Sequence, residues 1–586
     1  MLASELPTPA FLDRHIAKGQ EFGAVVANHS RGSELWLGEF ASCAGSGVPG
    51  VSDSFESCLW FMDALGSLAS QGHAVLARQA IIGGDYELVD RDTWAHNPDY
   101  WLAYLWPRLM GTRALGVTNP DSNATGLRAY AQCGLLLEGV TLALVNLNAH
   151  KTLTVRLSGL SAEPSDQPRQ EYHLSGNAEG GGVSGLTSRT LYMRGKPVTE
   201  ASFAHPLLVP VAEPVTLKPL SIAFVDIPDA SARTCLSARA RKTDDIAAAQ
   251  HFSWAGINHY YLWSCNATIR ENTLDAVRAA GLRVIRVFLL STTGQGSVAA
   301  CSDTPTPDLE PHEVGSYDDT ILERLDTLMF EAAARGLKLT VALHDRWSLG
   351  CWRTDSYAEK YRIHKVSNCG TEPGLNDPAR FYESAVARAD FQRRIAHILS
   401  HRSRHTQQPL GQWSEALLSV EAENEAFGHS QVTPAAKGWM CEMGQKIRSL
   451  IHPHVLVSSG GGGIGNDTGV AEFRRAAALA QCEHMDVVAL HTCESRPPAA
   501  SARRLHSDCS SQMRLRRPSS RCWLGMPRLL AAPTRGSSFK SGALKETTKL
   551  SRRPSFSRKR PPLPRGLYLA CTGGSIPSAA PATRTA

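Results

Sequence analysis

Two glutamate-bearing segments hold side chains that could act together as an acid and a nucleophile. Glu39 ends the apolar stretch ELWLGE, and small residues follow it. Glu425 ends the run VEAENE, in which strand alternation would place Glu421, Glu423 and Glu425 on one face. Hydrolysis of a glycosidic bond needs two carboxyl groups, one to protonate the leaving oxygen and one to act as nucleophile or base. The two segments therefore indicate glycosidic chemistry if the fold brings them together.

Each segment also has a plainer interpretation. Glu39 could be a surface glutamate at the start of a loop, and the glutamates of VEAENE could form a solvated acidic strand end. Three carboxylates cannot all be buried without compensating charge, so we expect one of them to lie at a barrel mouth with its pKa raised by its neighbours. Asn424 would then be placed to donate a hydrogen bond to a sugar hydroxyl.

Residues 1–112 have the alternating order of helices and strands that a barrel or doubly wound sheet uses. Helical spacing covers Pro9–Asn28, Phe55–Gln71 and Trp101–Met110, and apolar strands cover Glu34–Glu39 and His73–Ile82. We therefore assign this segment to part of a βα barrel.

The sequence pattern changes at residue 113. Runs such as VTLALVNLNAH and LSIAFVDIP alternate with turns rich in Gly, Pro, Asn and Ser. This spacing predicts an antiparallel β-sandwich over residues 113–229. Residues 230–250 then form a linker.

A βα rhythm returns over residues 251–493. The predicted strands are AGINHYYL, RVIRVFLL, KLTVALHD, ALLSVEAE, VLVSSGG and DVVALHT, with helices between them that include Thr320–Arg335 and Arg380–His401. Six βα units of a parallel barrel fit this order, and catalytic groups of such barrels come from the C-terminal ends of the strands. The fold class is thus α/β, with segments of a (β/α)8 barrel (a TIM barrel) and one antiparallel sandwich.

Residues 494–586 differ from the rest in charge. They carry 19 Lys and Arg against 3 Asp and Glu, so an acidic body ends in a basic tail. The tail lacks the periodic apolar positions whose burial would offset the entropy of ordering, and we expect it to be disordered. Polyanion binding by the tail is the alternative, and it would weaken steeply with salt.

Residues 8–228 resemble heparanase-like proteins of glycoside hydrolase family 79. The stretches that carry the resemblance are LWLGEFASCAGSGVPGVSDSF, FMDALG, RQAIIGGDYELVD and NPDYWLAYLWPRLMGTRAL. The resemblance implies that Glu39 is the catalytic nucleophile. It also implies that Tyr86 binds substrate and that the loop containing Gly45 and Gly47 contacts an acid sugar.

The chain departs from that family's pattern near these residues. Asp85 stands beside Tyr86 where the family has Asn, and Ser46 replaces a glycine. The resemblance covers only the seventh and eighth strands of the family's barrel. The family's acid/base glutamate therefore has no counterpart in this part of the chain.

Residues 252–493 resemble the endo-β-mannanase type of glycoside hydrolase family 5. The resemblance rests on GINHYYLW, VIRVFLL, VALHDRWS and the pair Asn424-Glu425. It implies that Glu425 is the acid/base, that Arg286 is the active-site arginine, and that Asn424 contacts the sugar beside the cleaved bond.

Further site residues follow from the same resemblance. His491 matches the histidine of an H-x-Y motif in which Cys493 replaces the tyrosine. Tyr260, Tyr261 and Trp347 are expected either to stack on sugar rings or to be core side chains. The family's nucleophile belongs to the seventh strand, and nothing after the histidine motif resembles a seventh or eighth strand.

The two resemblances are complementary. One supplies strands seven and eight with a nucleophile, and the other supplies strands one to six with an acid/base. We therefore hypothesise one circularly permuted barrel of the clan A glycosidase type, in which Glu39 faces Glu425. Their carboxyl groups should then lie about 5–5.5 Å apart, as retaining enzymes need. The alternative is two unrelated fragments, each with an open barrel edge.

The predicted function is hydrolysis of internal β-glycosidic bonds of a polysaccharide with retention, in the manner of an endo-β-1,4-mannanase. A heparanase-like endo-β-glucuronidase is one alternative, and a non-catalytic glycan-binding or inactive glycosidase is another. We expect no nucleic-acid partner, no integral membrane segment and no cofactor. No metal site is expected either, because the cysteines lack CxxC pairs and histidines at ligand spacing.

The resemblances imply an extracellular, vacuolar or lysosomal protein, although no signal peptide is visible at the N-terminus. Four Asn-x-Ser/Thr sequons and 14 cysteines would suit such a compartment. The sequons begin at Asn28, Asn123, Asn266 and Asn466. We expect most cysteines to be buried thiols, with one or two disulfides.

Overall fold

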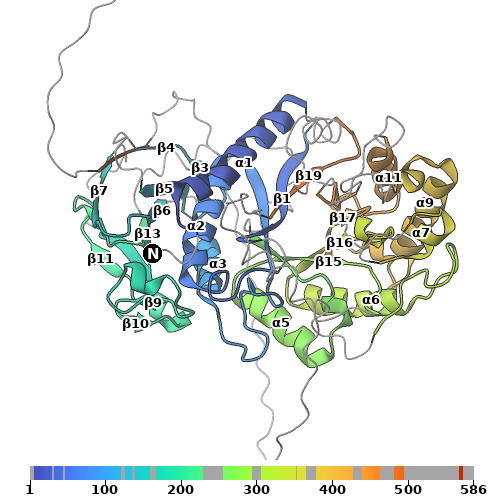
Figure 1. Cartoon of the computed structure of the whole chain (residues 1–586), viewed down its shortest axis with the longest axis horizontal. Helices are drawn as coiled ribbons and strands as arrows, with labels where there is room; N and C mark the ends of the chain where they lie inside the picture. Colours follow the sequence, from blue (N-terminus) through green and yellow to red (C-terminus); the bar gives the residue numbers. More distant parts are fainter. Residues whose placement is uncertain are drawn as a thin grey trace, which may run out of the picture.

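The structure is a computed structural model of the whole chain (Figure 1). The residues that it describes are 5–29, 32–43, 46–119, 126–134, 139–158, 167–228, 255–293, 305–351, 353–364, 378–426, 438–461, 481–493 and 567–571.

Eight parallel strands close into one barrel, in the order β1-β19-β18-β17-β16-β15-β14-β2. These strands are β1 (Glu34–Ala41), β2 (His73–Gln79), β14 (Ala255–Asn258), β15 (Val284–Phe288), β16 (Lys338–Ala342), β17 (Leu417–Glu421), β18 (Leu456–Ser458) and β19 (Val487–Cys493). The closed barrel confirms that the strands of both segments form a single sheet. The alternative of two fragments with open edges is wrong.

Two seams join the N-terminal strands to the other six. β1 pairs with β19 from Glu34 opposite Val487 to Ala41 opposite Cys493. β2 pairs with β14 from Leu76 opposite Ala255 to Gln79 opposite Asn258. Because both seams are hydrogen-bonded, no barrel strand is left as an edge.

Helices lie outside the barrel strands (Figure 1). They are α1 (Pro9–His29), α2 (Phe55–Ser70), α3 (Pro98–Leu109), α5 (Ala267–Ala279), α6 (Thr320–Ala334), α7 (Ser356–Lys360), α8 (Ala379–Glu383), α9 (Ala385–Ser400) and α11 (Trp439–Arg448). The helix expected over Arg380–His401 is interrupted at Ser384. Its side chain accepts a hydrogen bond from the Ala387 amide and caps α9, as serine does at a helix start.

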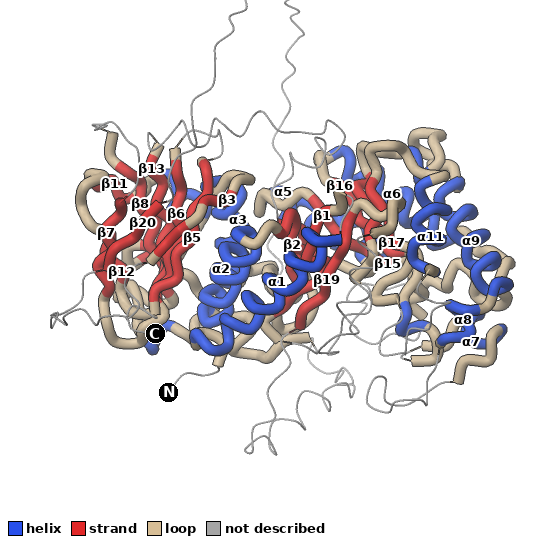
Figure 2. The backbone as a smooth tube through the Cα atoms, turned by 90° about the horizontal axis from the view of Figure 1, so that it is seen from above, coloured by secondary structure: helices blue, strands red, loops and turns tan. Residues whose placement is uncertain are grey.

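Helix α2 lies between the barrel and the β-sheets that follow it in the chain (Figure 2). Every residue of α2 except Ser70 is buried, as expected of a helix covered on all sides. The close approach of α2 to β5 requires Gly66, because a Cβ atom there would lie 2.1 Å from the Tyr130 ring. The Tyr130 hydroxyl donates a 2.5 Å hydrogen bond to the buried Asp63 and ties the two elements together.

Two further sheets follow the first two barrel strands. The larger has the order β10-β9-β8-β13-β6-β5-β3, with β11 on β8, and the smaller has the order β12-β7-β20-β4. Apolar residues of β5, β6 and β13 share one buried cluster with residues of β7 and β12. The strands are β3 (Ala114–Leu115), β4 (Val117–Thr118), β5 (Leu127–Cys133), β6 (Val140–Asn146), β7 (Leu153–Ser158), β8 (Arg169–Ser175), β9 (Tyr192–Met193), β10 (Lys196–Pro197), β11 (Leu207–Val209), β12 (Val215–Leu217), β13 (Ser221–Ile227) and β20 (Leu567–Cys571).

The expected linker over 230–250 lies outside the described residues. So does most of the expected disordered tail over 494–586. The described part of the tail is β20, which pairs antiparallel with β7 and parallel with β4.

The cysteines form more disulfides than the one or two expected. Cys441 is bonded to Cys482, and Cys133, Cys265 and Cys351 are disulfide-bonded as well. Within the described residues, no helix combines the length and the apolar character needed to cross a membrane.

Candidate active site

Glu39 lies near the C-terminal end of β1, the end at which parallel barrels carry their catalytic groups. In the parallel pairing with β19, Glu39 is opposite His491 and Gly38 is skipped, so β1 bulges at Gly38. A Cβ atom on Gly38 would lie 2.9 Å from Nε2 of His491. The glycine therefore allows the backbone of β1 to approach the histidine ring.

The Glu39 carboxylate is buried and is held from two sides. Nε2 of Gln79, the last residue of β2, donates a 2.7 Å hydrogen bond to Oε2 of Glu39. Nη1 of Arg286 donates to Oε1. Gln79 also donates to the hydroxyl of Tyr260, which follows β14. Both strand segments of the barrel thus supply groups that fix Glu39.

Arg286 lies in β15 and connects several acceptors of the site. Its Nη2 donates to Oε2 of Glu421 at 2.7 Å and to Oδ1 of Asn424 at 2.8 Å, while Nη1 contacts Glu39. Burial alone would lower the pKa of Arg286, but the negative charges of Glu421 and Glu39 raise it above its ordinary value. One buried guanidinium therefore forms ion pairs with two buried carboxylates.

Glu425 lies beyond the end of β17, because that strand ends at Glu421. Its φ of +48° departs from extended backbone, and its amide donates a 2.7 Å hydrogen bond to the carbonyl of Gly460. The expected strand alternation of Glu421, Glu423 and Glu425 is therefore wrong. Each of the three carboxylates has partners of its own.

The Glu425 carboxylate is bound by two donors. Trp347 Nε1 donates to Oε2 at 2.5 Å, and Nδ1 of His491 lies 2.9 Å from Oε1. Burial raises the pKa of Glu425, but the hydrogen bond and charge of His491, the Trp347 hydrogen bond and Arg286 together hold it below its ordinary value. The expectation of a raised pKa is wrong for Glu425, because these donors stabilise its ionised form more than burial disfavours it.

The two carboxylates meet at His491. One oxygen of Glu39, one oxygen of Glu425 and a ring nitrogen of His491 all lie within 4.8 Å of one another. Nδ1 of His491 is 3.9 Å from Oε2 of Glu39 and 2.9 Å from Oε1 of Glu425. The structure thus brings together the two glutamates that the sequence placed in separate segments.

These three side chains are of types that bind divalent metals, but their present partners fit a hydrogen-bonded pair better. Arg286, Gln79 and Trp347 already donate to the carboxylate oxygens. Nε2 of His491 is buried and has no hydrogen-bond partner among the described residues. Nδ1 of His491 therefore carries a proton, which it donates to Glu425.

Glu423, the middle glutamate of VEAENE, is buried away from the pair. It accepts hydrogen bonds from His344 Nδ1 at 2.7 Å and from the Tyr382 hydroxyl at 2.6 Å. Burial would lower the pKa of His344, but hydrogen bonds with Asp355 and Glu423 raise it to about 10. The positive charge of His344 compensates the charge of this carboxylate. Glu423 therefore has a structural role, because it holds His344 and Tyr382 in place.

Asn424 is fixed by protein groups on both sides of its amide. Its Oδ1 accepts from Arg286, and its Nδ2 donates a 2.9 Å hydrogen bond to Oδ1 of Asp345. The sugar contact expected of Asn424 would add to these bonds. Asn424 thereby links Asp345 to the arginine that holds Glu39.

Sequence reasoning missed Gln79 and Asp345. Gln79 is the last residue of β2, and Asp345 follows the end of β16 at Ala342 by three residues; strand ends were the criterion that selected Glu39. Burial raises the pKa of Asp345 to about 6, against the hydrogen bond from Asn424. The same criterion would have found Asp345, which ends the predicted strand KLTVALHD, but not Gln79, because the predicted strand ran on to Ile82.

The aromatic residues expected to stack on sugars are mostly enclosed. Tyr261 and Trp347 are 7% and 8% exposed, and the Tyr261 hydroxyl accepts a 2.9 Å hydrogen bond from Arg353. Tyr260 is half-buried and stacks on Phe288 with ring centroids 4.3 Å apart. Tyr260 is therefore the most accessible of the three.

Tyr86 lies beside the C-terminal ends of β1 and β2, where it packs with Ala41 and Ala80. Gly47 contacts it closely: a Cβ atom there would lie 2.9 Å from the Tyr86 amide nitrogen, and its φ is +93°. Gly45, the other glycine of the expected substrate loop, lies outside the described residues.

Comparison with known proteins matches both segments. A family model described as "GH family 5 beta-mannosidase-like" covers residues 247–494. Heparanase-like protein 2 of Arabidopsis thaliana is 34% identical over an alignment of 244 positions, which covers 36% of this chain and 44% of the relative. The chain resembles two kinds of glycosidase. Both suspected resemblances are confirmed.

Other relatives agree with this result. Baicalin-beta-D-glucuronidase of Scutellaria baicalensis is 30% identical over 39% of this chain and 42% of its own length. Heparanase of Mus musculus is 33% identical over 38% of this chain and 43% of its own length. The chain thus spans less than half the length of these relatives. Among solved structures, an endo-1,4-beta-mannanase from Rhizomucor miehei covers 41% of this chain and 67% of its own, at 20% identity and a TM-score of 0.32.

Proposed function

We propose that this chain is a glycoside hydrolase that cleaves internal β-glycosidic bonds with retention of configuration. The observation that carries the proposal is the meeting of Glu39 and Glu425 in one barrel, with an oxygen of each within 4.8 Å. Retaining enzymes hold their carboxyl groups about 5–5.5 Å apart, whereas inverting enzymes leave a wider gap for water. The relatives named above are glycosidases, which supports the same conclusion.

Glu425 is the proposed acid/base and Glu39 the proposed nucleophile. In the first step a carboxylate oxygen of Glu39 bonds to the anomeric carbon while the bond to the leaving oxygen breaks. That oxygen takes a proton from Glu425. In the second step Glu425 removes a proton from water, the water oxygen bonds to the anomeric carbon, and Glu39 is released. Arg286 and Gln79 position Glu39 for both steps.

For substrate, we propose a β-1,4-mannan, because residues 247–494 match the β-mannosidase-like family model and contain Glu425, Arg286 and Asn424. A glucuronic-acid-containing glycan is the second candidate. Its support is the contact of Gly47 with Tyr86, which packs on Ala41 in the segment that resembles heparanase-like proteins. A non-catalytic glycan-binding protein is less well supported, because a second carboxylate does stand near Glu425.

Release of reducing ends from mannan, cellulose and a heparan-type glycan tests this proposal. The wild type, Glu425→Gln and Glu39→Gln are compared at equal concentrations of folded protein. We expect cleavage of mannan by the wild type and loss of cleavage in both variants. Cleavage of the heparan-type glycan alone would favour the second candidate. A folded wild type that cuts none of the three would contradict the proposal.

The Trp347 hydrogen bond gives a pH prediction. A general acid must carry its proton, so the first step fails as pH rises through the pKa of Glu425, and that pKa is held low in part by Trp347. Trp347→Phe removes the donor and keeps an aromatic ring, so it should raise this pKa. The alkaline limb of the kcat profile should then move to higher pH.

Trp413→Phe is the control for this prediction, because Trp413 precedes the N-terminal end of β17, at the opposite end of the barrel. The alkaline limb of the kcat profile of Trp413→Phe should lie at the same pH as that of the wild type. An unmoved or lowered limb in Trp347→Phe would contradict the assignment of Glu425 as the acid.

Two coarser features complete the proposal. We infer that the eight-stranded and four-stranded sheets form the β-sandwich expected over 113–229, because residues of both sheets share one apolar cluster. A secreted, vacuolar or lysosomal location is supported by the Cys441–Cys482 disulfide, since disulfides persist in oxidising compartments.

A further inference from the structure

A sequon stands at the start of α5 and has no part in the carboxylate network. It comprises Asn266, Ala267 and Thr268. All three residues are exposed. Asn266 is the N-cap of α5, and its Oδ1 accepts a 3.0 Å hydrogen bond from the Ile269 amide. The geometry holds the asparagine in one place at the surface by its carbonyl oxygen.

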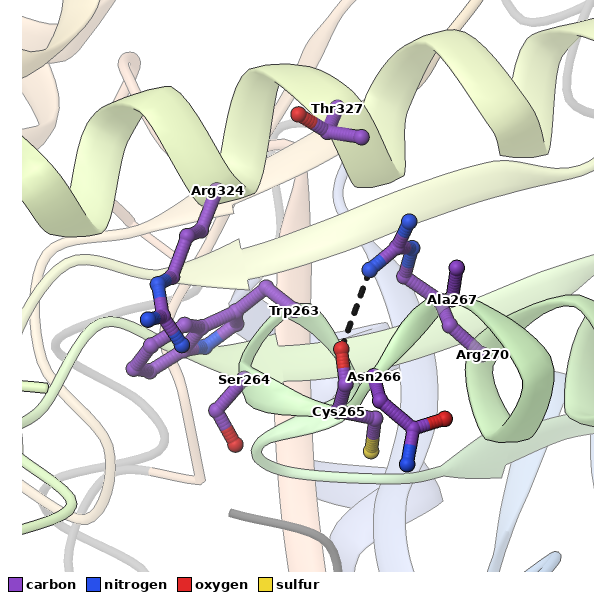
Figure 3. A pocket seen from close by; sticks show the side chains of 8 residues that line it. All are labelled: Trp263, Ser264, Cys265, Asn266, Ala267, Arg270, Arg324 and Thr327. Atoms are coloured by element: carbon purple, nitrogen blue, oxygen red, sulfur yellow. Dashed lines mark hydrogen bonds between the residues drawn. The ribbon is translucent and has the colours of Figure 1, made fainter. Parts of the chain in front are cut away.

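A pocket of about 210 Å³ lies against this sequon (Figure 3). It opens between η5 (Leu262–Ser264), the first turn of α5 and the middle of α6. Residues that line it include Trp263, Ser264, Asn266, Arg270 and Arg324. Pockets for drug-sized ligands measure roughly 300–1,000 Å³, so this one suits a single sugar ring better than an oligosaccharide.

Polar groups line the pocket on the α6 side. In Figure 3 the guanidinium of Arg324 extends from α6 towards Trp263 and Ser264. Arg324 has no ion-pair partner among the described residues, whereas Arg270 binds Glu331 with two hydrogen bonds, of 2.5 and 2.6 Å. Arg324 is therefore placed to donate to a hydroxyl or acetamide oxygen in the pocket.

The residue before the sequon, Cys265, indicates in which cellular compartment the chain folds. Cys265 is disulfide-bonded, as are Cys133, Cys351, Cys441 and Cys482. Disulfides of this number form in the oxidising secretory lumen, where sequons are also glycosylated. The sequon and the disulfide of Cys265 thus both indicate that this segment passes through the secretory lumen.

We propose that Asn266 carries an N-linked glycan whose first N-acetylglucosamine lies against this pocket. In the transfer, Nδ2 of Asn266 bonds to the anomeric carbon of a polyprenyl-diphosphate-linked oligosaccharide and loses a proton. The polyprenyl diphosphate leaves. Oδ1 is untouched by this reaction and continues to cap α5. The proposal does not depend on the catalytic assignment.

Glycopeptide mass spectrometry tests occupancy in the full chain secreted from a eukaryotic host behind a cleavable leader. We expect a glycan on the Asn266 peptide of the wild type, and its loss in Asn266→Asp and Thr268→Ala. Asn266→Asp keeps an oxygen acceptor for the α5 cap, so loss of the glycan is separated from loss of the cap. Thr268→Ser preserves the sequon and should keep the glycan, as should the distant control Asn28→Gln. An unmodified Asn266 in the secreted wild type overturns the proposal.

The contact between the first N-acetylglucosamine and the pocket is tested by a second measurement. Enzymatic removal of the glycan should be severalfold slower from the native protein than from the denatured protein. Arg324→Ala should speed the native reaction and leave the denatured one unchanged. Equal native rates in the wild type and in Arg324→Ala would overturn the contact with the pocket.

Discussion

Glu425→Ala should cut polysaccharide cleavage by about 10²–10⁴-fold, the usual cost of losing a general acid. An aryl glycoside with a dinitrophenyl leaving group needs no protonation, so the first step should survive and a glycosyl ester on Glu39 should accumulate. Azide needs no general base. It should restore turnover and give the β-glycosyl azide, because two displacements retain the configuration.

Glu39→Ala should lose activity by roughly 10⁴-fold or more. Azide should restore turnover but give the opposite anomer to the one expected from Glu425→Ala. Azide takes the place of the missing carboxylate and attacks once, so the α-glycosyl azide is expected. The double variant should be no worse than the poorer single variant, because the two groups act as a unit. Nuclear magnetic resonance of the products measures the anomeric configuration of each glycosyl azide.

The control for both variants is Glu359→Gln, an exposed glutamate of α7, which should keep wild-type activity. Exchanged anomers of the azide products would mean that the roles of Glu39 and Glu425 are reversed. If azide restores neither variant, the two residues are not an acid and a nucleophile of a retaining mechanism.

Arg286→Met should lower the free energy of unfolding of the barrel by about 3–5 kcal/mol, the cost of breaking a buried ion pair from one side. Its guanidinium is 2% exposed and contacts Glu39 and Glu421, whose side chains are 9% and 2% exposed. Without it, two buried carboxylates lack their counter-charge. The midpoint of urea unfolding, followed by tryptophan fluorescence, measures the loss.

A matched control is Arg335→Met, because the Arg335–Asp275 pair on the surface has side chains 20% and 61% exposed. Screened surface pairs contribute less than about 1 kcal/mol. The double variant Arg286→Met with Glu421→Leu should recover part of the loss by removing one uncompensated charge. Equal losses in Arg286→Met and Arg335→Met would show that the buried carboxylates do not depend on Arg286.

The pairing of Glu39 with Glu425 could be anticipated because both stand near strand ends and the two resemblances add up to eight strands. The pKa direction of Glu425 could not. It depends on Trp347 and His491, which lie 78 and 66 positions away in the chain. The predicted strand alternation also extended beyond the true end of β17, because nothing in VEAENE shows where extended backbone stops and φ becomes positive.

The disulfides show a similar limit. Counting cysteines gave too few bridges, because pairing depends on which thiols the fold brings together, as for Cys441 and Cys482 with Cα atoms 5.7 Å apart. The helices were predicted more closely, since their 3.6-residue periodicity is local.

The seam between β1 and β19 has a consequence for biosynthesis. Ser33 Oγ donates a hydrogen bond to the carbonyl of Met485, across 452 positions of the chain. At about 5–20 residues per second, the ribosome needs roughly 20–90 s to supply that partner after Ser33 has been added. Throughout this time β1 is a nascent strand with an unpaired edge, which is the condition in which chains aggregate or engage chaperones. Slowing translation should therefore depress the yield of folded protein more than it does for a fold in which every strand pairs only with its neighbours in the sequence.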